Sequence, residues 1–287
     1  MFQGIKDLEY ETYKGVNYYL CKSCSLIFQY PLPDKNLLPN FYPEEYRNFK
    51  MYKDDLFSSL KNIQFQELAG KISKHIAKGS KILEVGFGNG QLLLALKDQG
   101  FEKLYGSDFT DRAFKSLKNY GIELTVNNIE EEFPFNETFD VIIMNNVIEH
   151  FLNPVQVLKK CKNNLSKNGK IILITPNSHA IEFSIFKKYW AGFHAPRHIF
   201  IFNKNNISLL SKNLGFSKVN IESITDPGQW SISMQNLLQE KNLTKTKLKN
   251  GMAWYTLPLS IICAPLATLQ NFLDKSTSMM CVLENEA

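Results

Sequence analysis

The sequence predicts an α/β fold in which a mostly parallel sheet carries helices on both faces. From residue 81 onward, short apolar runs alternate with segments whose apolar residues recur every three or four positions. Two of these helical segments close on a glycine, Gly100 and Gly121, as helices commonly do. The chain has 287 residues and is 44% hydrophobic, so it can bury a large core. Alternation at this spacing is typical of βαβ units.

The expected elements follow in chain order. A helix is expected first, at about 56–77, where apolar residues recur with helical spacing. Strands are then expected at 81–85, 103–108, 122–126, 139–146, 169–176, 217–225 and 278–284, and helices at 91–100, 112–121, 153–165 and 207–216. The stretch of roughly fifty residues before the last strand is too long for a plain loop, so it should carry helices of its own.

This pattern divides the chain into four expected parts. Residues 1–50, rich in Tyr and Pro, form an N-terminal extension of short strands and loops. Residues 51–225 form the core, 226–277 a helical apolar insertion, and 278–287 the last strand of the core.

Charge and cysteine content limit the classes of partner. Lys+Arg is 33 against Asp+Glu 28, and this excess is spread along the chain rather than clustered, so no nucleic-acid partner is expected. The five cysteines are an odd, mostly scattered set, which is typical of a reducing, cytoplasmic protein. The N-terminus has no basic start followed by an apolar core, so no signal peptide is predicted.

One apolar segment, 250–273, has no charged residue and is long enough to span a bilayer. Pro258 and Pro265 interrupt it. A buried cap or a helix pair in a homodimer is therefore the favoured interpretation, with a peripheral membrane contact through 252–273 as the alternative.

The loop after the first core strand contains Gly86, Gly88 and Gly90, which allow a sharp turn and close approach of the backbone to a ligand. Gln91 stands where a dinucleotide-binding loop would have its third glycine. Glu84 precedes the loop, and its carboxylate would repel a pyrophosphate but attract a cationic head such as the amino group of a methionine moiety.

A second acid, Asp108, ends the next strand, a position from which a carboxylate accepts hydrogen bonds from ribose hydroxyls. A cationic amino-acid head and a ribose without a phosphate together describe S-adenosylmethionine.

The stretch 81–216 resembles the class I S-adenosylmethionine-dependent methyltransferases. The matching motifs are EVGFGNG (84–90), Asp108, FDVIIMNNVIEHFLNP (139–154) and LSKNGKIILITPN (165–177). The subgroup with an EH…P and a PRH motif includes many bacterial methyltransferases of sugars and small metabolites. The resemblance implies a Rossmann-like fold of seven strands in the order 3-2-1-4-5-7-6, with the last strand antiparallel.

The resemblance also implies the cofactor site. The segment 127–135 should cover the adenine, and because Asn128 or Ile129 stands where the family often has Asp, the backbone can supply that contact. The expected cofactor-binding residues are Glu84, Gly86, Phe87, Gly88, Gly90, Asp108, Phe109, Asn128, Ile129, Asn145 and Asn146.

Methyl transfer to an alcohol needs an aligned acceptor and a base, and His is the usual base near neutral pH. His150, His194 and His198 should lie over the site. His150 is expected as a base or as a structural residue that holds loops, and His194 and His198 as a base or as substrate-contacting residues. Arg197 either binds an anionic group of the acceptor or pairs with a carboxylate of a nearby loop. Ubiquinone-pathway relatives bind a divalent cation through Glu-x-x-Glu-His; here Asn146 replaces the first Glu, so no metal is predicted.

Two features of the N-terminal extension remain open. Cys21 and Cys24, within 18–33, resemble half of a zinc ribbon that precedes some sugar methyltransferases, but too few ligands are present, so a hairpin without zinc is expected. Tyr42 and Tyr46 either close a lid over the cofactor or pack in an aromatic core.

The predicted function is therefore O-methylation of a sugar or a sugar-linked metabolite, with His-assisted deprotonation. The alternatives are a quinone-type or other small-molecule methyltransferase, and a non-catalytic S-adenosylmethionine-binding partner of another enzyme.

Overall fold

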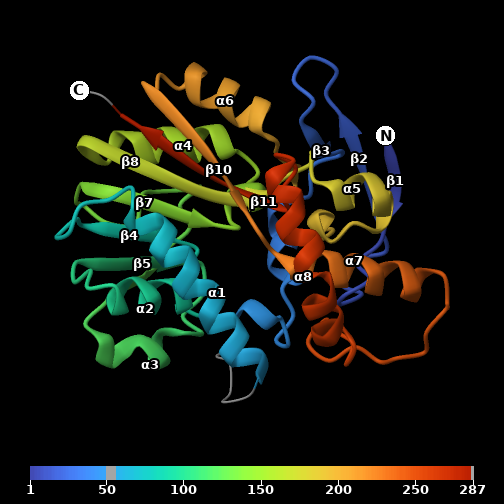
Figure 1. Ribbon diagram of the computed structural model, residues 1–287. Helices are drawn as coiled ribbons and strands as arrows, with labels where there is room; N and C mark the ends of the chain where they lie inside the picture. The colour runs from blue at the N-terminus through green and yellow to red at the C-terminus, as the bar shows by residue number, and fades with distance from the viewer. Residues whose placement is uncertain (50–55, 286–287) are drawn as a thin grey trace.

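The computed structural model describes residues 1–49 and 56–285. The expected boundary between residues 50 and 51 therefore lies outside the described residues, as do the last two residues of the expected segment 278–287. A seven-stranded sheet forms the centre of the molecule (Figure 1). Its strands are β4 (Ile82–Val85), β5 (Leu104–Asp108), β6 (Glu123–Val126), β7 (Phe139–Asn145), β8 (Leu165–Pro176), β10 (Lys218–Ile224) and β11 (Ser278–Glu284).

The strand order confirms the prediction. The sheet runs β6-β5-β4-β7-β8-β11-β10, which is the order 3-2-1-4-5-7-6, and β11 is antiparallel to both of its neighbours. Val85 of β4 pairs with Ser107 of β5 and with Met144 of β7, so these three parallel strands end at one edge of the sheet. Ligands of such sheets bind at this edge.

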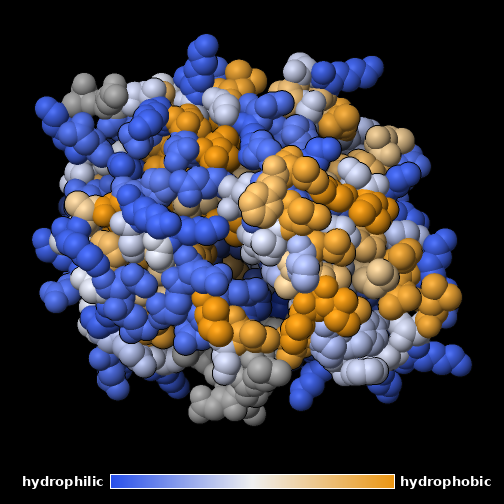
Figure 2. All heavy atoms as spheres, viewed as in Figure 1, coloured by the Kyte–Doolittle hydropathy of each residue, from blue (hydrophilic) through white to orange (hydrophobic). Residues whose placement is uncertain are grey.

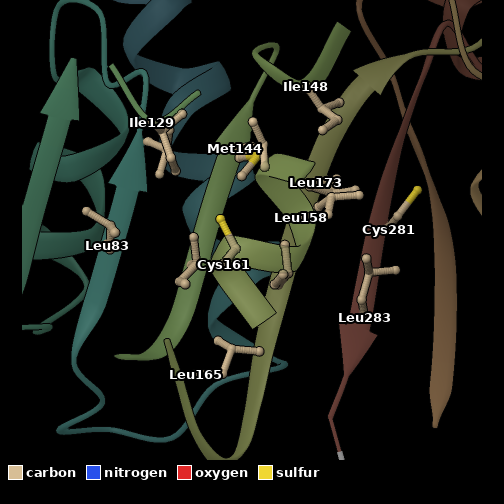
Figure 3. Packing of buried hydrophobic residues seen from close by; sticks show 14 of the residues in the cluster. Leu83, Ile129, Met144, Ile148, Leu158, Cys161, Leu165, Leu173, Cys281 and Leu283 are labelled. Carbon is tan, nitrogen blue, oxygen red and sulfur yellow. The ribbon is translucent and has the colours of Figure 1, made fainter. Parts of the chain in front are cut away.

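Alternating side chains of the strands pack on two helical layers. On one face Ile143 and Ile172 pack in a cluster with α1 (Leu56–Ser73), α2 (Gln91–Asp98) and α3 (Phe114–Leu117). On the other face Ile142 and Ile171 pack with α4 (Pro154–Asn163) and α6 (Lys204–Asn213). Figure 3 shows this second face, where Leu158 and Cys161 of α4 lie over Met144 and Leu173 of the sheet. The two-residue period of strands produces both layers.

The boundaries of some elements differ from the expected ones. β8 begins at Leu165 rather than at 169, and α3 has only four residues before a 3-10 turn at Lys118–Tyr120. α6 begins at Lys204 because Asn203 caps it: its side chain accepts from the N–H of Asn206 at 3.1 Å.

A second, antiparallel sheet is built by the N-terminal extension. Its order is β1 (Phe2–Ile5), β2 (Val16–Leu20), β3 (Ile27–Gln29) and β9 (Phe200–Ile201). β2 and β3 form the hairpin expected at 18–33, whereas β9 was not predicted. The segments Lys35–Phe41 and Arg47–Phe49 that follow are 3-10 helices. β9 comes from the segment that carries His194 and His198, so the extension is joined directly to the expected acceptor side.

Two helices occupy the segment before β11: α7 (Pro227–Glu240) and α8 (Thr256–Phe272). They pack on each other, and Gln235 of α7 accepts a hydrogen bond from the Thr256 hydroxyl of α8 at 2.8 Å. Shorter helical segments, namely Ile148–His150, α5 (Ile181–Phe186), Lys187–Tyr189 and Ala191–Phe193, connect the core strands. Among the described helices, none combines the length and hydropathy needed to cross a bilayer.

Candidate active site

A cavity of about 1050 Å³ lies at the carboxyl ends of β4, β5 and β7. α1 forms one of its walls, α7 and α8 another, and the segments around Tyr42 and His194 contribute as well. The expected site residues among its lining are Glu84, Gly86, Phe87, Gly88, Asp108, Phe109, Asn128, Ile129, Asn145, Asn146, His150, His194 and His198. Gly90 and Arg197 are not part of the lining.

The glycine loop is shaped by packing as well as by access to the cavity. Gly86 has φ +71°, and a Cβ there would lie 2.5 Å from Cγ2 of Val147. Gly90 caps α2 with φ +78°, and its Cβ would lie 2.4 Å from Cδ1 of Leu117. The packing of α2 on α3 therefore requires a glycine at position 90, and the expected contact of Gly90 with the cofactor stays a prediction.

The two acids of the loop lie close to each other in the cavity wall. Glu84 is 2% exposed, and its Oε2 has no hydrogen-bond partner among the described residues. Asp108 accepts hydrogen bonds from the N–H of Gly88 at 2.9 Å and of Thr110 at 3.1 Å. A buried carboxylate without a partner is costly unless a ligand supplies one. Oε2 of Glu84 is therefore available to a donor group of a bound molecule.

Burial has a direct effect on the protonation of both acids. Burial, and secondly the charge of Asp108, raises the pKa of Glu84 well above its usual value. Burial raises the pKa of Asp108 to about 6, although backbone donors such as Gly88 N–H oppose the shift. A cationic ligand group would favour the ionised form of both carboxyls.

The expected adenine side of the cavity contains Phe109, Asn128 and Ile129. The Phe109 side chain is half exposed, and its ring lies 5.4 Å from that of Tyr42. The Asn128 side chain accepts from the N–H of Glu130 at 3.1 Å and so supports its own turn. Asn145 ends β7, and Asn146 follows with φ +53°.

His194 is held at both ring nitrogens. Its Nδ1 lies 3.0 Å from Oε1 of Glu9, and its Nε2 lies 3.1 Å from the hydroxyl of Tyr46. Burial alone would raise the pKa of Glu9. Arg47 and His194 instead hold this pKa well below its usual value, and Nη1 of Arg47 lies 2.8 Å from Oε2 of Glu9. The ionised Glu9 can only accept, so Nδ1 of His194 carries the proton and Nε2 accepts from Tyr46.

His150 and His198 lie against each other, with ring centroids 4.7 Å apart. Nδ1 of His150 lies 3.0 Å from the carbonyl of Arg197 and 3.0 Å from the Tyr42 hydroxyl. Burial, and then His194, lowers the pKa of His150 to about 3. Nδ1 of His198 lies 2.8 Å from the carbonyl of Gly192, and burial lowers its pKa well below the usual value. Both rings are neutral at physiological pH.

Arg197 has a structural position. It is 1% exposed, and its Nη2 donates to Oδ2 of Asp7 at 2.9 Å. Burial disfavours the charged form of Arg197, but the charge of Asp7 outweighs this and raises the pKa of the guanidinium. In the same way, burial would raise the pKa of Asp7, but Arg197 lowers it. Of the two alternatives for Arg197, the structure therefore has the ion pair with a loop carboxylate.

Glu149, His150 and His198 form one cluster that could hold a metal ion. One potential ligand atom of each lies within 4.8 Å of the others. Oε2 of Glu149 accepts from Thr175 at 3.0 Å, while Oε1 has no hydrogen-bond partner among the described residues and lies 3.8 Å from Nε2 of His198. Burial raises the pKa of Glu149 to about 8, so the carboxyl is protonated near pH 7 without a cation. The expected absence of a metal stays a prediction.

Two acids in contact with the site were not found from the sequence. Glu9 and Asp7 lie in the N-terminal extension, more than 180 positions from their partners His194 and Arg197. No local spacing signals such contacts. The one available signal was the acidic run DLE at 7–9 in a tyrosine-rich segment.

Comparisons with known proteins agree on the family. The model of the methyltransferase-domain family matches residues 60–221, more than half of the chain. An uncharacterized protein of Methanocaldococcus jannaschii is 29% identical over 181 residues, which cover 62% of this chain and 80% of that protein. The ubiquinone biosynthesis O-methyltransferase of Rickettsia canadensis is 27% identical over 198 residues, covering 66% of this chain and 80% of the relative.

Solved structures share the fold at low identity. Phosphoethanolamine N-methyltransferase 2 of Haemonchus contortus has a TM-score of 0.56 and 16% identity, covering 91% of this chain and 62% of that one. A SAM-dependent methyltransferase of Archaeoglobus fulgidus has a TM-score of 0.51 and 15% identity, covering 80% of this chain and 100% of that one.

Proposed function

Because this chain belongs to the methyltransferase-domain family and is an S-adenosylmethionine-dependent enzyme, we propose that it methylates a hydroxyl group of a small, sugar-like acceptor. One observation carries the proposal: the same cavity is lined by Glu84, which has a buried oxygen without a partner among the described residues, and by a histidine that an ionised carboxylate orients.

The residues of the glycine loop fit the cofactor. Glu84, with one buried oxygen unpartnered among the described residues, would receive the cationic amino group, and Asp108 would accept from the ribose hydroxyls. When bound, the cofactor supplies an activated methyl group. The cavity walls would align the acceptor with this methyl group, and such alignment is the larger part of catalysis for an activated donor.

We assign the role of general base to His194. Among the three histidines of the site, His194 is the one whose ring bonds an ionised carboxylate, that of Glu9. The carboxyl beside His198 belongs to Glu149, whose pKa of about 8 keeps it protonated near pH 7. Glu9 fixes the tautomer of His194, leaves Nε2 as the basic nitrogen, and stabilises the imidazolium that forms on proton transfer. Tyr46 lines the cavity and bonds this nitrogen, so an acceptor hydroxyl reaches Nε2 directly or through Tyr46.

The acceptor side of the cavity combines hydroxyl and amide groups with aliphatic ones. Polar lining residues here are Asp226, Gln229, Ser231, Thr256, Ser260 and Thr268, and aliphatic ones are Leu257, Ile261 and Ala264. A lining with several hydrogen-bonding groups on an apolar wall suits a hydroxylated ring that carries an apolar portion. A phenol of the quinone type is the second candidate, favoured by the similarity to ubiquinone biosynthesis O-methyltransferases.

The test is a methyl-transfer assay with purified protein, S-adenosylmethionine and two acceptor panels, nucleotide sugars and dihydroxybenzenes with prenyl chains. The proposal expects S-adenosylhomocysteine to form with a sugar, and mass spectrometry to place the methyl group on oxygen. Transfer to the phenols alone would select the second candidate. No transfer to either panel by protein that binds S-adenosylhomocysteine would exclude both acceptor classes.

A further inference from the structure

α8 presents an apolar face that no described element covers. Positions 258, 262, 265, 269 and 272 are exposed at helical spacing, and exposed residues beside them, at 261, 266, 268 and 273, widen this face. Ile262 is 70% exposed, Leu269 56% and Phe272 83%, and Trp254 just before the helix is 78% exposed. Figure 2, in the same view as Figure 1, shows an apolar area over α8 beside the hollow at the centre. Such a concentration of large apolar side chains marks a contact surface.

The segment that leads into α8 is strongly basic. Lys241, Lys245, Lys247 and Lys249 are all exposed, and no acidic residue occurs from 241 to 273. Within the described ranges, none of the four lysines forms an ion pair. The segment connects α7 to α8 along the lower edge of the view (Figure 1). Positive charge without acidic partners, next to exposed aromatic and aliphatic side chains, is the pattern of surfaces that bind anionic lipids.

The same surface borders the cavity. Ile261 of α8 and Ile63 of α1 are each 54% exposed and also line the cavity. The opening therefore lies between α1 and α8, where Figure 2 shows the hollow with apolar residues on both sides. A surface that lay against this face would meet the entrance of the acceptor site.

From these three features we propose that the exposed face of α8, together with the lysines of 241–249, docks the protein on an anionic lipid bilayer, with the cavity mouth toward the membrane. Trp254, Ile262 and Phe272 enter the interface between headgroups and acyl chains, and the lysines contact the anionic headgroups. The docking depends on this surface alone and not on the reaction, so it can fail while the proposed function holds.

Sedimentation of the full chain with vesicles tests the proposal. One set of vesicles is phosphatidylcholine alone, and the other contains about one third phosphatidylglycerol. The proposal expects binding to the anionic vesicles and little binding to the neutral ones. It further expects that binding falls about tenfold or more both in Ile262→Glu/Phe272→Glu and in Lys245→Glu/Lys247→Glu.

Matched controls lie on other elements. Val155→Glu changes an exposed apolar residue of α4, and Lys115→Glu/Lys118→Glu changes two exposed lysines near α3; both should bind vesicles as the parent does. Unchanged affinity for S-adenosylhomocysteine in every variant shows that the cofactor site is intact. Equal loss in the controls, or no binding of the parent to anionic vesicles, overturns the proposal. A dimer in light scattering that Ile262→Glu/Phe272→Glu dissociates, without vesicle binding, would assign the face to a second copy instead.

Discussion

Two buried glutamates show how the cofactor side and the acceptor side of the cavity differ. Glu84, on the cofactor side, has an oxygen without a partner among the described residues and a raised pKa. Glu9, on the acceptor side, forms an ion pair with Arg47 and a hydrogen bond with His194. These two residues hold its pKa well below the usual value against the effect of burial. In the proposed site, the bound cofactor would supply the missing partner of Glu84, whereas residues of the chain itself supply the partners of Glu9. Mutations on the two sides should separate binding from chemistry.

The largest effect is expected from His194→Ala. Loss of the base should lower kcat by about 10²–10⁴-fold, the usual contribution of general base catalysis. Affinity for S-adenosylhomocysteine should change by less than about twofold, because His194 belongs to the acceptor side. Steady-state kinetics and calorimetry measure the two quantities.

Glu9→Gln is the companion variant: it keeps the shape of the side chain but removes its charge, and should lower kcat less. An unchanged kcat in both variants would remove His194 from the mechanism.

Arg197→Leu should affect stability rather than binding. It leaves Asp7 buried without its partner, so the free energy of unfolding should fall by about 3–5 kcal/mol. Arg197→Lys keeps the charge and should lose less. Denaturant unfolding measures the change. If stability were retained and only the KM for the acceptor rose, the alternative role of Arg197 in acceptor binding would be favoured.

Asp108→Ala should weaken S-adenosylhomocysteine binding by about 100-fold or more, since two ribose hydroxyls lose their acceptor. The chain should remain folded, because the carboxylate is buried at a cost rather than paired with a cation. Calorimetric titration is the measurement, with Asp111→Ala, an exposed acid on the same loop, as the control. Equal binding by both variants would contradict the assignment of Asp108.

Ligand affinity and the stability of the unbound protein should depend on pH in opposite directions. The proposed contact of Asp108 with ribose favours the ionised carboxylate, so affinity for S-adenosylhomocysteine should fall as pH drops below about 6, by up to about tenfold per pH unit. In the unbound protein, the pKa of Asp108 is about 6 in the folded state and 3.8 in the unfolded state, so protonation of Asp108 stabilises the fold. This stabilisation is complete below pH 3.8 and is lost as pH rises through about 6. Calorimetry and thermal unfolding between pH 5 and 8 test both signs, with Asp108→Asn removing the dependence.

The smallest effect is expected from Tyr18→Phe. The fully buried Tyr18 of β2 donates to the carbonyl of His198 at 2.7 Å and so ties the N-terminal sheet to the acceptor side. Removing the hydroxyl should cost about 1–3 kcal/mol of stability and lower kcat only modestly. A large loss of S-adenosylhomocysteine affinity would show that the two sides are coupled.

The same contrast explains what the sequence could predict. Local periodicity predicts the alternation of strands and helices, whereas the strand order is implied by the resemblance of the motifs that contain Glu84 and Asp108 to a known family. The site assignments themselves stay predictions. β9 has two residues and pairs with a strand more than 170 positions earlier, so no local pattern reveals it. Glu9, Asp7 and the ring contacts of Tyr46 depend on such distant pairings too.

The position of β11 has a consequence for how the molecule is assembled during synthesis. Within the described sheet, β10 hydrogen-bonds only to β11. In the chain, α7 and α8 lie between these two strands. The ribosome must therefore deliver the helices of the acceptor wall before β10 can join the sheet. Since chains grow at about 5–20 residues per second, the half that carries Glu84 and Asp108 has seconds in which to fold first. A nascent chain halted before residue 278 should thus lack the strand that joins β10 to the sheet, while β4 and β5, which carry Glu84 and Asp108, are already complete.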